Sequence, residues 1–126
     1  MDLKNNSKFW LGSTIGYMVL LLGASLKPDF HPESATKIKQ LTHNFAHIPA
    51  YSLLTFFLVN ALGGYKITSK IFMWAFGISV VYGAFNEVVQ SFVPGRTASV
   101  LDVGSNTLGT IMLLLFIKKG YFRITF

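Results

Sequence analysis

The chain has 126 residues, of which 52% are hydrophobic and only 13% are charged. With a mean hydropathy of +0.49, this composition excludes a water-soluble enzyme, a coiled coil and a disordered tail, because each of these needs more charge. The net charge of +6 does not indicate nucleic-acid binding, because the basic residues flank apolar stretches, and without cysteine the chain has no disulfide or thiolate site.

Four apolar stretches are long enough to cross a membrane as helices, and Glu87 and Asp102 are the only charged residues inside them. A helix needs roughly 20 mainly apolar residues to cross the hydrocarbon core. Lipid offers the backbone no hydrogen-bond partner outside a helix or a closed barrel. We therefore predict an all-α integral membrane bundle, a single domain over residues 1–126, with transmembrane helices at 9–26, 48–65, 71–92 and 100–117.

The first stretch, 9–26, exceeds the about 7 to 15 apolar residues usual in a signal peptide, so we predict a retained span. The polar linker after it carries apolar residues at spacings of three, four and three: Ile38, Leu41, Phe45 and Ile48. This pattern predicts a short amphipathic helix on the outer membrane surface before the second span.

Short connections join the last three stretches. Only Lys66 to Lys70 separate the second stretch from the third, so these two helices must be antiparallel neighbours. Pro94 ends the third helix and Gly95 permits the turn into the fourth, which predicts an up-down-up bundle. Small residues four positions apart favour close helix contacts, and they occur at Gly12 and Gly16 and at Ser105 and Gly109.

Lysine and arginine are distributed unequally over the two sides of such a bundle. One side carries seven and the other four, namely Lys4, Lys8, Lys66, Lys70, Lys118, Lys119 and Arg123 against Lys27, Lys37, Lys39 and Arg96. Cytoplasmic loops are enriched in these residues. With an even number of spans, we therefore predict that both termini lie in the cytoplasm.

Polar and ionisable residues gather near the predicted outer ends of three spans. His43 precedes the second span, and His47 and Tyr51 lie at its start. Glu87 and Gln90 lie in the third span, Asp102 and Asn106 lie in the fourth span, and Arg96 lies in the connection between these two spans. An unpaired charge at the bilayer centre costs on the order of 3 kcal/mol, so an intramembrane acid indicates a functional site. We predict such a site here, with Arg96, His47 or Lys39 as a partner for Glu87.

Structural explanations compete with this site. Arg96 could form a purely structural ion pair with the acid of the third span. Ser99 and Asp102 fit a capping box at a helix start. Asn106 could hydrogen-bond to a neighbouring helix, and Tyr51 is equally well explained as an aromatic residue of the membrane interface.

Two blocks of these residues resemble the VanZ-like family of small bacterial membrane proteins. The first is His47-Ile-Pro-Ala-Tyr51, and the second, from Gly83 to Gly109, follows G-x-x-x-E-x-x-Q-x-x-x-P-G-R-x-x-S-x-x-D-x-x-x-N-x-x-G. The resemblance implies a multi-pass protein of the bacterial plasma membrane, in a family whose namesake is linked to low-level resistance to the glycopeptide teicoplanin. It points to the site residues His47, Tyr51, Glu87, Gln90, Arg96, Ser99, Asp102 and Asn106.

From these residues we predict a site that binds or modifies an anionic envelope molecule, such as a lipid-linked phosphate or a lipid headgroup. Arg96 would bind a phosphate or carboxylate through two hydrogen bonds, and the helix that begins near Ser99 would direct its positive end at the same anion. If a reaction occurs, His47 is the general base, and Glu87 or Asp102 orients it. Binding is favoured over catalysis, because we recognise no activated serine or phosphatase motif. The other predicted binding residues are Gln90, Asn106 and Tyr51.

Two other functions remain as alternatives. His43, His47, Glu87 and Asp102 could ligate zinc in a membrane hydrolase, although neither an H-E-x-x-H motif nor a cysteine pair supports this. The chain could instead be a non-catalytic accessory subunit of an envelope enzyme, with the polar cluster only joining its helices. No cofactor or nucleic acid is predicted, and the expected partners are membrane lipids, a lipid-linked envelope precursor or a glycopeptide.

Overall fold

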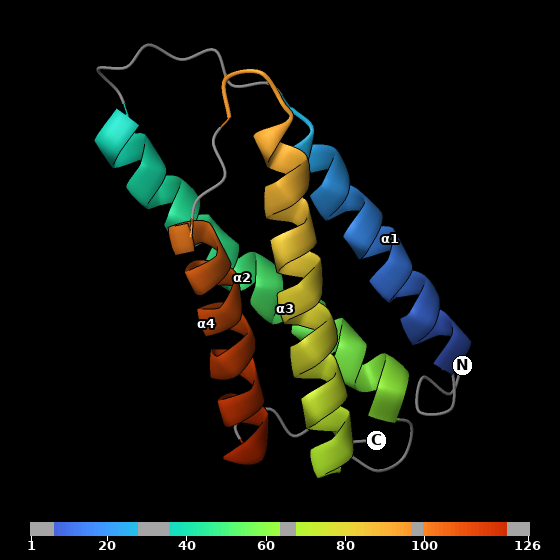
Figure 1. Cartoon of the computed structure of the whole chain (residues 1–126). Helices are drawn as coiled ribbons and strands as arrows, with labels where there is room; N and C mark the ends of the chain where they lie inside the picture. Colours follow the sequence, from blue (N-terminus) through green and yellow to red (C-terminus); the bar gives the residue numbers. More distant parts are fainter. Residues whose placement is uncertain (1–6, 28–35, 64–67, 97–99, 121–126) are drawn as a thin grey trace.

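The computed structural model describes residues 7–27, 36–63, 68–96 and 100–120, with the backbone alone for 36–41 and 43. These residues form four helices, which are α1 (Ser7–Ser25), α2 (Thr36–Gly63), α3 (Ser69–Ser91) and α4 (Val100–Lys118). The described part of the chain contains no strand, which confirms the predicted all-α fold. The helices alternate in direction, so the end of α1, the end of α3 and the start of α4 lie at one end of the bundle (Figure 1).

Three of the described helical segments are long and apolar enough to cross a membrane. They are Asn44–Gly63 of α2, the whole of α3 and the whole of α4, and they coincide with the second, third and fourth predicted spans. α1 covers most of the predicted first span but is not one of these three segments. The chain is therefore a membrane protein by its apolar helices, and a fourth crossing by α1 stays a prediction.

The predicted amphipathic helix and the predicted second span form one continuous helix. α2 runs through Pro49 without interruption, so the structure does not show a separate surface helix that turns into the span. A proline inside a helix removes one backbone hydrogen bond, and its ring crowds the carbonyl four residues earlier, which here belongs to Phe45. Hydroxyl groups bind the carbonyls on either side of Pro49, since Ser52 donates to Ile48 O and Tyr17 donates to Ala50 O, each at 2.8 Å.

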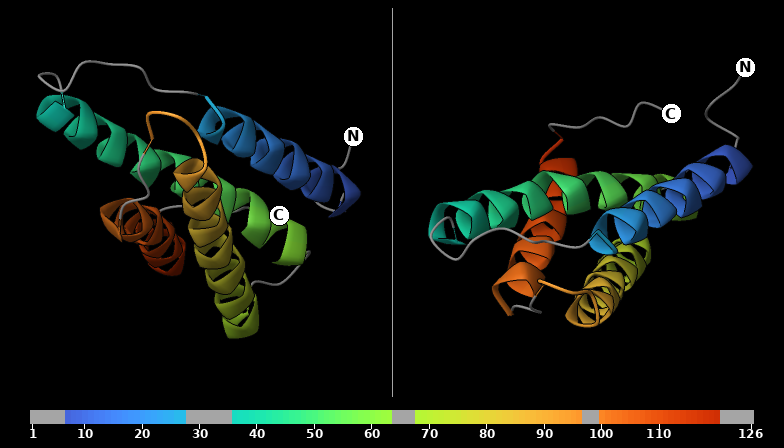
Figure 2. Two further views of the ribbon diagram at one scale, coloured as in Figure 1. Left: turned by 45° about the horizontal axis from the view of Figure 1, so that its top comes forward. Right: turned by 90° about the horizontal axis from the view of Figure 1, so that it is seen from above.

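α2 is the central helix and contacts α1, α3 and α4. Seen from above, it lies across α3 and α4 (Figure 2). Its closest approach is to α4, because a Cβ added to Gly109 would lie 2.2 Å from Ile48 O, and Ser52 Oγ also donates to Gly109 O at 2.8 Å. The close contact predicted at Gly109 is confirmed.

The other predicted small-residue contact is wrong for the described chain. A Cβ added to Gly12 or Gly16 would meet nothing within 4 Å, so no neighbouring helix approaches this part of α1. The two positions face away from α2, with which α1 makes its main contact. Spacing alone identified the glycines, but the rotation of α1 about its axis decides which face is in contact.

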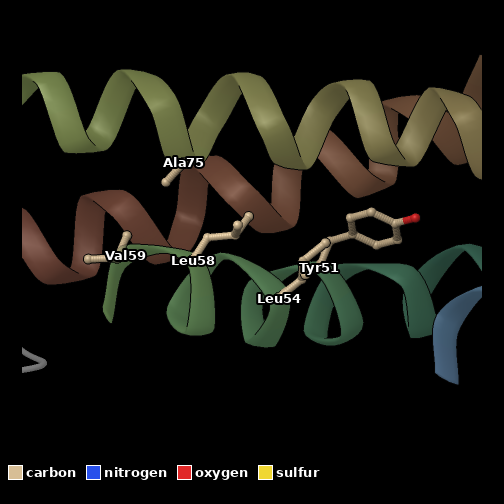
Figure 3. Close-up of a cluster of buried hydrophobic side chains, with 5 residues drawn as sticks. All are labelled: Tyr51, Leu54, Leu58, Val59 and Ala75. Atoms are coloured by element: carbon tan, nitrogen blue, oxygen red, sulfur yellow. The ribbon is translucent and has the colours of Figure 1, made fainter. Parts of the chain in front are cut away.

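The interior combines an apolar cluster with a cluster of hydroxyl groups. Tyr51, Leu54, Leu58 and Val59 of α2 and Ala75 of α3 form the apolar cluster (Figure 3). The hydroxyl cluster joins three helices, because Ser79 Oγ lies 2.7 Å from Thr110 Oγ1, and Thr55 Oγ1 lies within 3.3 Å of both atoms. All three residues of this hydroxyl cluster have no exposed surface. Lipid provides no hydrophobic force between helices, so such hydrogen bonds and close contacts hold the bundle together.

The glycine contact predicts opposite effects of one substitution at two positions. Gly109→Ala should lower the free energy of unfolding by about 1 to 3 kcal/mol, because its Cβ overlaps the Ile48 carbonyl. Gly16→Ala should leave it unchanged or raise it by about 0.5 to 1 kcal/mol, because alanine is the better helix former. Thermal unfolding of the purified protein in detergent measures both, and equal melting temperatures for the two variants would contradict the helix contact.

The hydroxyl cluster predicts a difference between two threonines of α4. Thr110→Val removes hydrogen bonds to two other helices and should cost about 0.5 to 1.5 kcal/mol. Thr107→Val removes only a bond to Val103 O of the same helix and serves as the matched control. The same unfolding measurement in detergent tests this, and a Thr107→Val variant at least as destabilised as Thr110→Val would show that the cluster does not join the helices.

Candidate functional site

A partly open pocket of about 320 Å³ lies among the ends of α1 and α3, the middle of α2 and the turn before α4. A cavity of this size lies in the range of small-ligand sites. Its lining residues are Leu21, Ala24, Ser25, Lys27, Ala46, His47, Ala50, Tyr51, Asn86, Gln90 and Arg96. Four of the predicted site residues are therefore brought together around one cavity, namely His47, Tyr51, Gln90 and Arg96.

His47 is held by a hydrogen bond to α4. Its Nδ1 lies 2.5 Å from Oδ1 of Asn106, a residue with 1% of its surface exposed. A carboxamide oxygen only accepts, so Nδ1 donates, and in the neutral ring Nε2 is the nitrogen that carries the lone pair. The imidazole also stacks on the Tyr51 ring one turn along α2, with the planes 7° apart. These contacts fix both the orientation and the tautomer of His47.

Tyr51 places a hydroxyl group at the buried side of the pocket. Its side chain is 2% exposed, and Asn86 Nδ2 donates to its hydroxyl oxygen at 2.8 Å. No described residue accepts the hydroxyl hydrogen, so Tyr51 can donate to a ligand. Gly83 makes room for this arrangement, because a Cβ there would lie 2.9 Å from Asn106 Nδ2 and 3.2 Å from Tyr51 Cε1.

The end of α1 forms the opposite wall. Gln90 Nε2 of α3 donates to Ser25 Oγ at 3.3 Å, and Ser25 Oγ in turn donates to Leu21 O at 2.9 Å. Further from the pocket, the Tyr82 hydroxyl donates to Met18 O. Hydrogen bonds thus join α1 to α3 both at the pocket and further along α1.

The charged residues that line the pocket are both basic. Arg96 is half-buried, and its Nε has no hydrogen-bond partner among the described residues. Lys27 is exposed and also lines the pocket. Among the described residues, no aspartate or glutamate lines the pocket. Positive charge without a balancing carboxylate favours the binding of an anion.

The two predicted acids do not line the pocket. Glu87 is 3% exposed and lies on the buried face of α3, with Asn86 and Gln90. Asp102 lies in the first turn of α4, is 5% exposed, and its Oδ1 has no hydrogen-bond partner among the described residues. Ser99, the predicted capping partner of Asp102, lies outside the described residues.

The zinc alternative gains no support from the part of the chain that the structure describes. Within that part, no three histidine, aspartate or glutamate side chains come together around a possible metal position. The side chain of His43, which this alternative requires, lies outside the described residues.

Sequence reasoning missed the three other polar residues of the lining, which are Ser25, Lys27 and Asn86. The first two lie beyond the motif blocks, and nothing local distinguishes them from other residues at a helix end. Asn86 could have been found, because it is four residues before Gln90 and so shares a helix face with it.

No curated protein and no solved structure matches this chain significantly. A family model described as VanZ/LLP1 matches residues 18–123, which include α2, α3, α4 and every lining residue of the pocket. Because this match covers far more than half of the chain, and three helices are apolar enough to span a membrane, the protein belongs to the VanZ/LLP1 family of membrane proteins.

Proposed function

We propose that the pocket at the end of the bundle binds an anionic cell-envelope molecule, such as a lipid-linked phosphate or a lipid headgroup. The observation that carries this proposal is Arg96, whose half-buried guanidinium has an Nε without a partner among the described residues. Leaving a buried donor unsatisfied costs about 1 to 3 kcal/mol. A phosphate or carboxylate in the pocket would satisfy Arg96 through two hydrogen bonds and would also attract Lys27.

The neutral groups of the pocket fit the same ligand. Tyr51 can donate its hydroxyl hydrogen, and the Gln90 amide carries a second N–H beside the one given to Ser25. The alkyl side chains of Leu21, Ala24, Ala46 and Ala50 provide apolar contact for an amphiphile. The lining therefore combines anion-binding donors with an apolar side, as an envelope lipid requires.

Binding has more support than catalysis. His47 could accept a proton through Nε2, because Asn106 holds its Nδ1 as a donor. However, Glu87 and Asp102, the acids predicted to assist it, are not among the lining residues. In this proposal His47 contacts the ligand, Asn106 orients His47, and a link to teicoplanin resistance would follow from binding of an envelope precursor.

We place the protein in the bacterial plasma membrane with four spans, both termini in the cytoplasm and the pocket facing outward. The excess of Lys and Arg at the opposite end of the bundle supports this orientation. Of the described residues, Lys8, Lys70, Lys118 and Lys119 lie toward that end, against Lys27 and Arg96 at the pocket.

The orientation predicts opposite accessibility of the two ends of α3. The chain has no cysteine, so Thr68→Cys and Pro94→Cys each introduce a single thiol at an exposed position just outside α3. An impermeant maleimide should label Pro94→Cys in intact cells and Thr68→Cys only after permeabilisation. The reverse pattern would overturn the outward-facing pocket.

Arg96 predicts a loss of anion affinity. Arg96→Gln should weaken binding of dihexanoyl phosphatidic acid to the detergent-purified protein by about tenfold or more, because a hydrogen bond to a charged group is worth about 1.5 to 3 kcal/mol. Arg96→Lys should recover part of the loss, since it keeps the charge but not the two-pronged geometry. Isothermal titration measures all three proteins.

Lys118→Gln is the charge-matched control, because Lys118 is exposed in the last turn of α4, at the other end of the bundle. It should bind phosphatidic acid like the wild type. Unchanged affinity of Arg96→Gln, or equal wild-type affinity for dihexanoyl phosphatidylcholine, would contradict the proposal.

A further inference from the structure

Two buried polar atoms without a hydrogen-bond partner among the described residues belong to side chains that line the pocket. One is Arg96 Nε, a donor, and the other is Asn86 Oδ1, an acceptor. An anion satisfies Arg96 and so accounts for the first atom. It does nothing for Asn86 Oδ1, because an anion brings no hydrogen to donate.

The carboxamide of Asn86 is fixed in place. The residue is 2% exposed, and its Nδ2 donates to the Tyr51 hydroxyl oxygen at 2.8 Å. With Nδ2 bound to Tyr51, Oδ1 is the amide atom that has no partner in the part of the chain that the structure describes. A buried acceptor with no partner costs about 1 to 3 kcal/mol, so a ligand that donates a hydrogen here gains affinity.

Asn60 is a second buried asparagine, and it lies outside the pocket. Its Oδ1 is likewise buried without a partner among the described residues, and its Nδ2 donates at 2.7 Å to Phe56 O of the same helix. Asn60 does not line the pocket, so a ligand there could not reach it. Of these two asparagines, only Asn86 belongs to the cavity.

We propose that the ligand carries a hydroxyl group next to its anionic group, as in a phosphate ester of a polyol such as glycerol phosphate. This rests on the proposed function and adds a second requirement to it. Arg96 binds the phosphate, and Asn86 Oδ1 accepts a hydrogen bond from the hydroxyl. An ammonium group could also donate to Asn86, but Arg96 and Lys27 line the same pocket and would repel it. Asn86 is therefore the residue that determines specificity.

The test compares three soluble ligands by isothermal titration of the detergent-purified protein. sn-Glycerol 3-phosphate and propyl phosphate share a charged group and a three-carbon chain, but only the first has hydroxyl groups. The wild type should prefer glycerol phosphate by about tenfold, the equivalent of one hydrogen bond to a buried group. Phosphoethanolamine should bind more weakly than glycerol phosphate. This comparison needs no variant, so it stands even if a substitution impairs folding.

Two matched variants assign the preference to Asn86. Asn86→Leu should lose the tenfold preference and still bind propyl phosphate, because Arg96 is intact. Asn60→Leu, which replaces an equally buried asparagine outside the pocket, should keep the preference. A preference that survives in Asn86→Leu, or that is lost equally in Asn60→Leu, would overturn the assignment.

The outcomes separate this inference from the proposed function. Equal wild-type affinity for glycerol phosphate and propyl phosphate, weakened alike by Arg96→Gln, would overturn the hydroxyl requirement and leave the anion pocket standing. No affinity for any of the three phosphates would overturn both. The polyol phosphate could be a lipid headgroup or a free phosphate ester, and hexanoyl lysophosphatidylglycerol distinguishes these two ligands. If it binds more tightly than glycerol phosphate, the ligand is a lipid headgroup. If the two bind equally, the ligand is a free ester.

Discussion

The close approach of α4 to α2 at Gly109 is the contact on which the site depends. A Cβ at Gly109 would lie 2.2 Å from Ile48 O, so glycine is required at this separation of the helices. His47 directly precedes Ile48, and Asn106 lies about one turn before Gly109. The same contact therefore brings the His47 ring and the Asn106 amide to 2.5 Å. Thr110, the next residue, joins the buried hydroxyl cluster.

The interior of this bundle is polar in places where a soluble domain would be apolar. Among the described residues, Thr55, Ser79, Asn86, Asn106 and Thr110 are almost fully buried, whereas Phe92 and Val100 are more than 80% exposed. In a membrane, an exposed apolar side chain faces acyl chains as apolar as any protein core, so burial gains little. Hydrogen bonds between helices gain more, and the same preference allows a polar pocket to form at the end of the bundle.

α1 completes the pocket although it carries neither motif block. Its attachments include the Tyr17 hydroxyl, which donates to Ala50 O, the Tyr82 hydroxyl, which donates to Met18 O, and Gln90, which donates to Ser25. On the α1 side, the contact at Met18 uses a main-chain carbonyl, which every residue type supplies. The contacts at Tyr17 and Ser25 use side chains of α1, so they depend on the residue types at those two positions.

The sequence by itself determined that the four apolar stretches are helical and at which end of the bundle the polar residues gather, because apolar length and turn residues act locally. It did not determine that α2 begins at Thr36 and runs through Pro49. It also grouped His47, Tyr51, Gln90 and Arg96, which the structure brings to one cavity. The tertiary structure alone decided that Ser25 and Lys27 join them, and that Glu87 and Asp102 do not line the cavity. It likewise decided that Gly109 makes a close contact while Gly12 and Gly16 do not. The physical reason is that the rotation of each helix about its axis is set by packing against its neighbours, and spacing within one helix carries no information about that rotation.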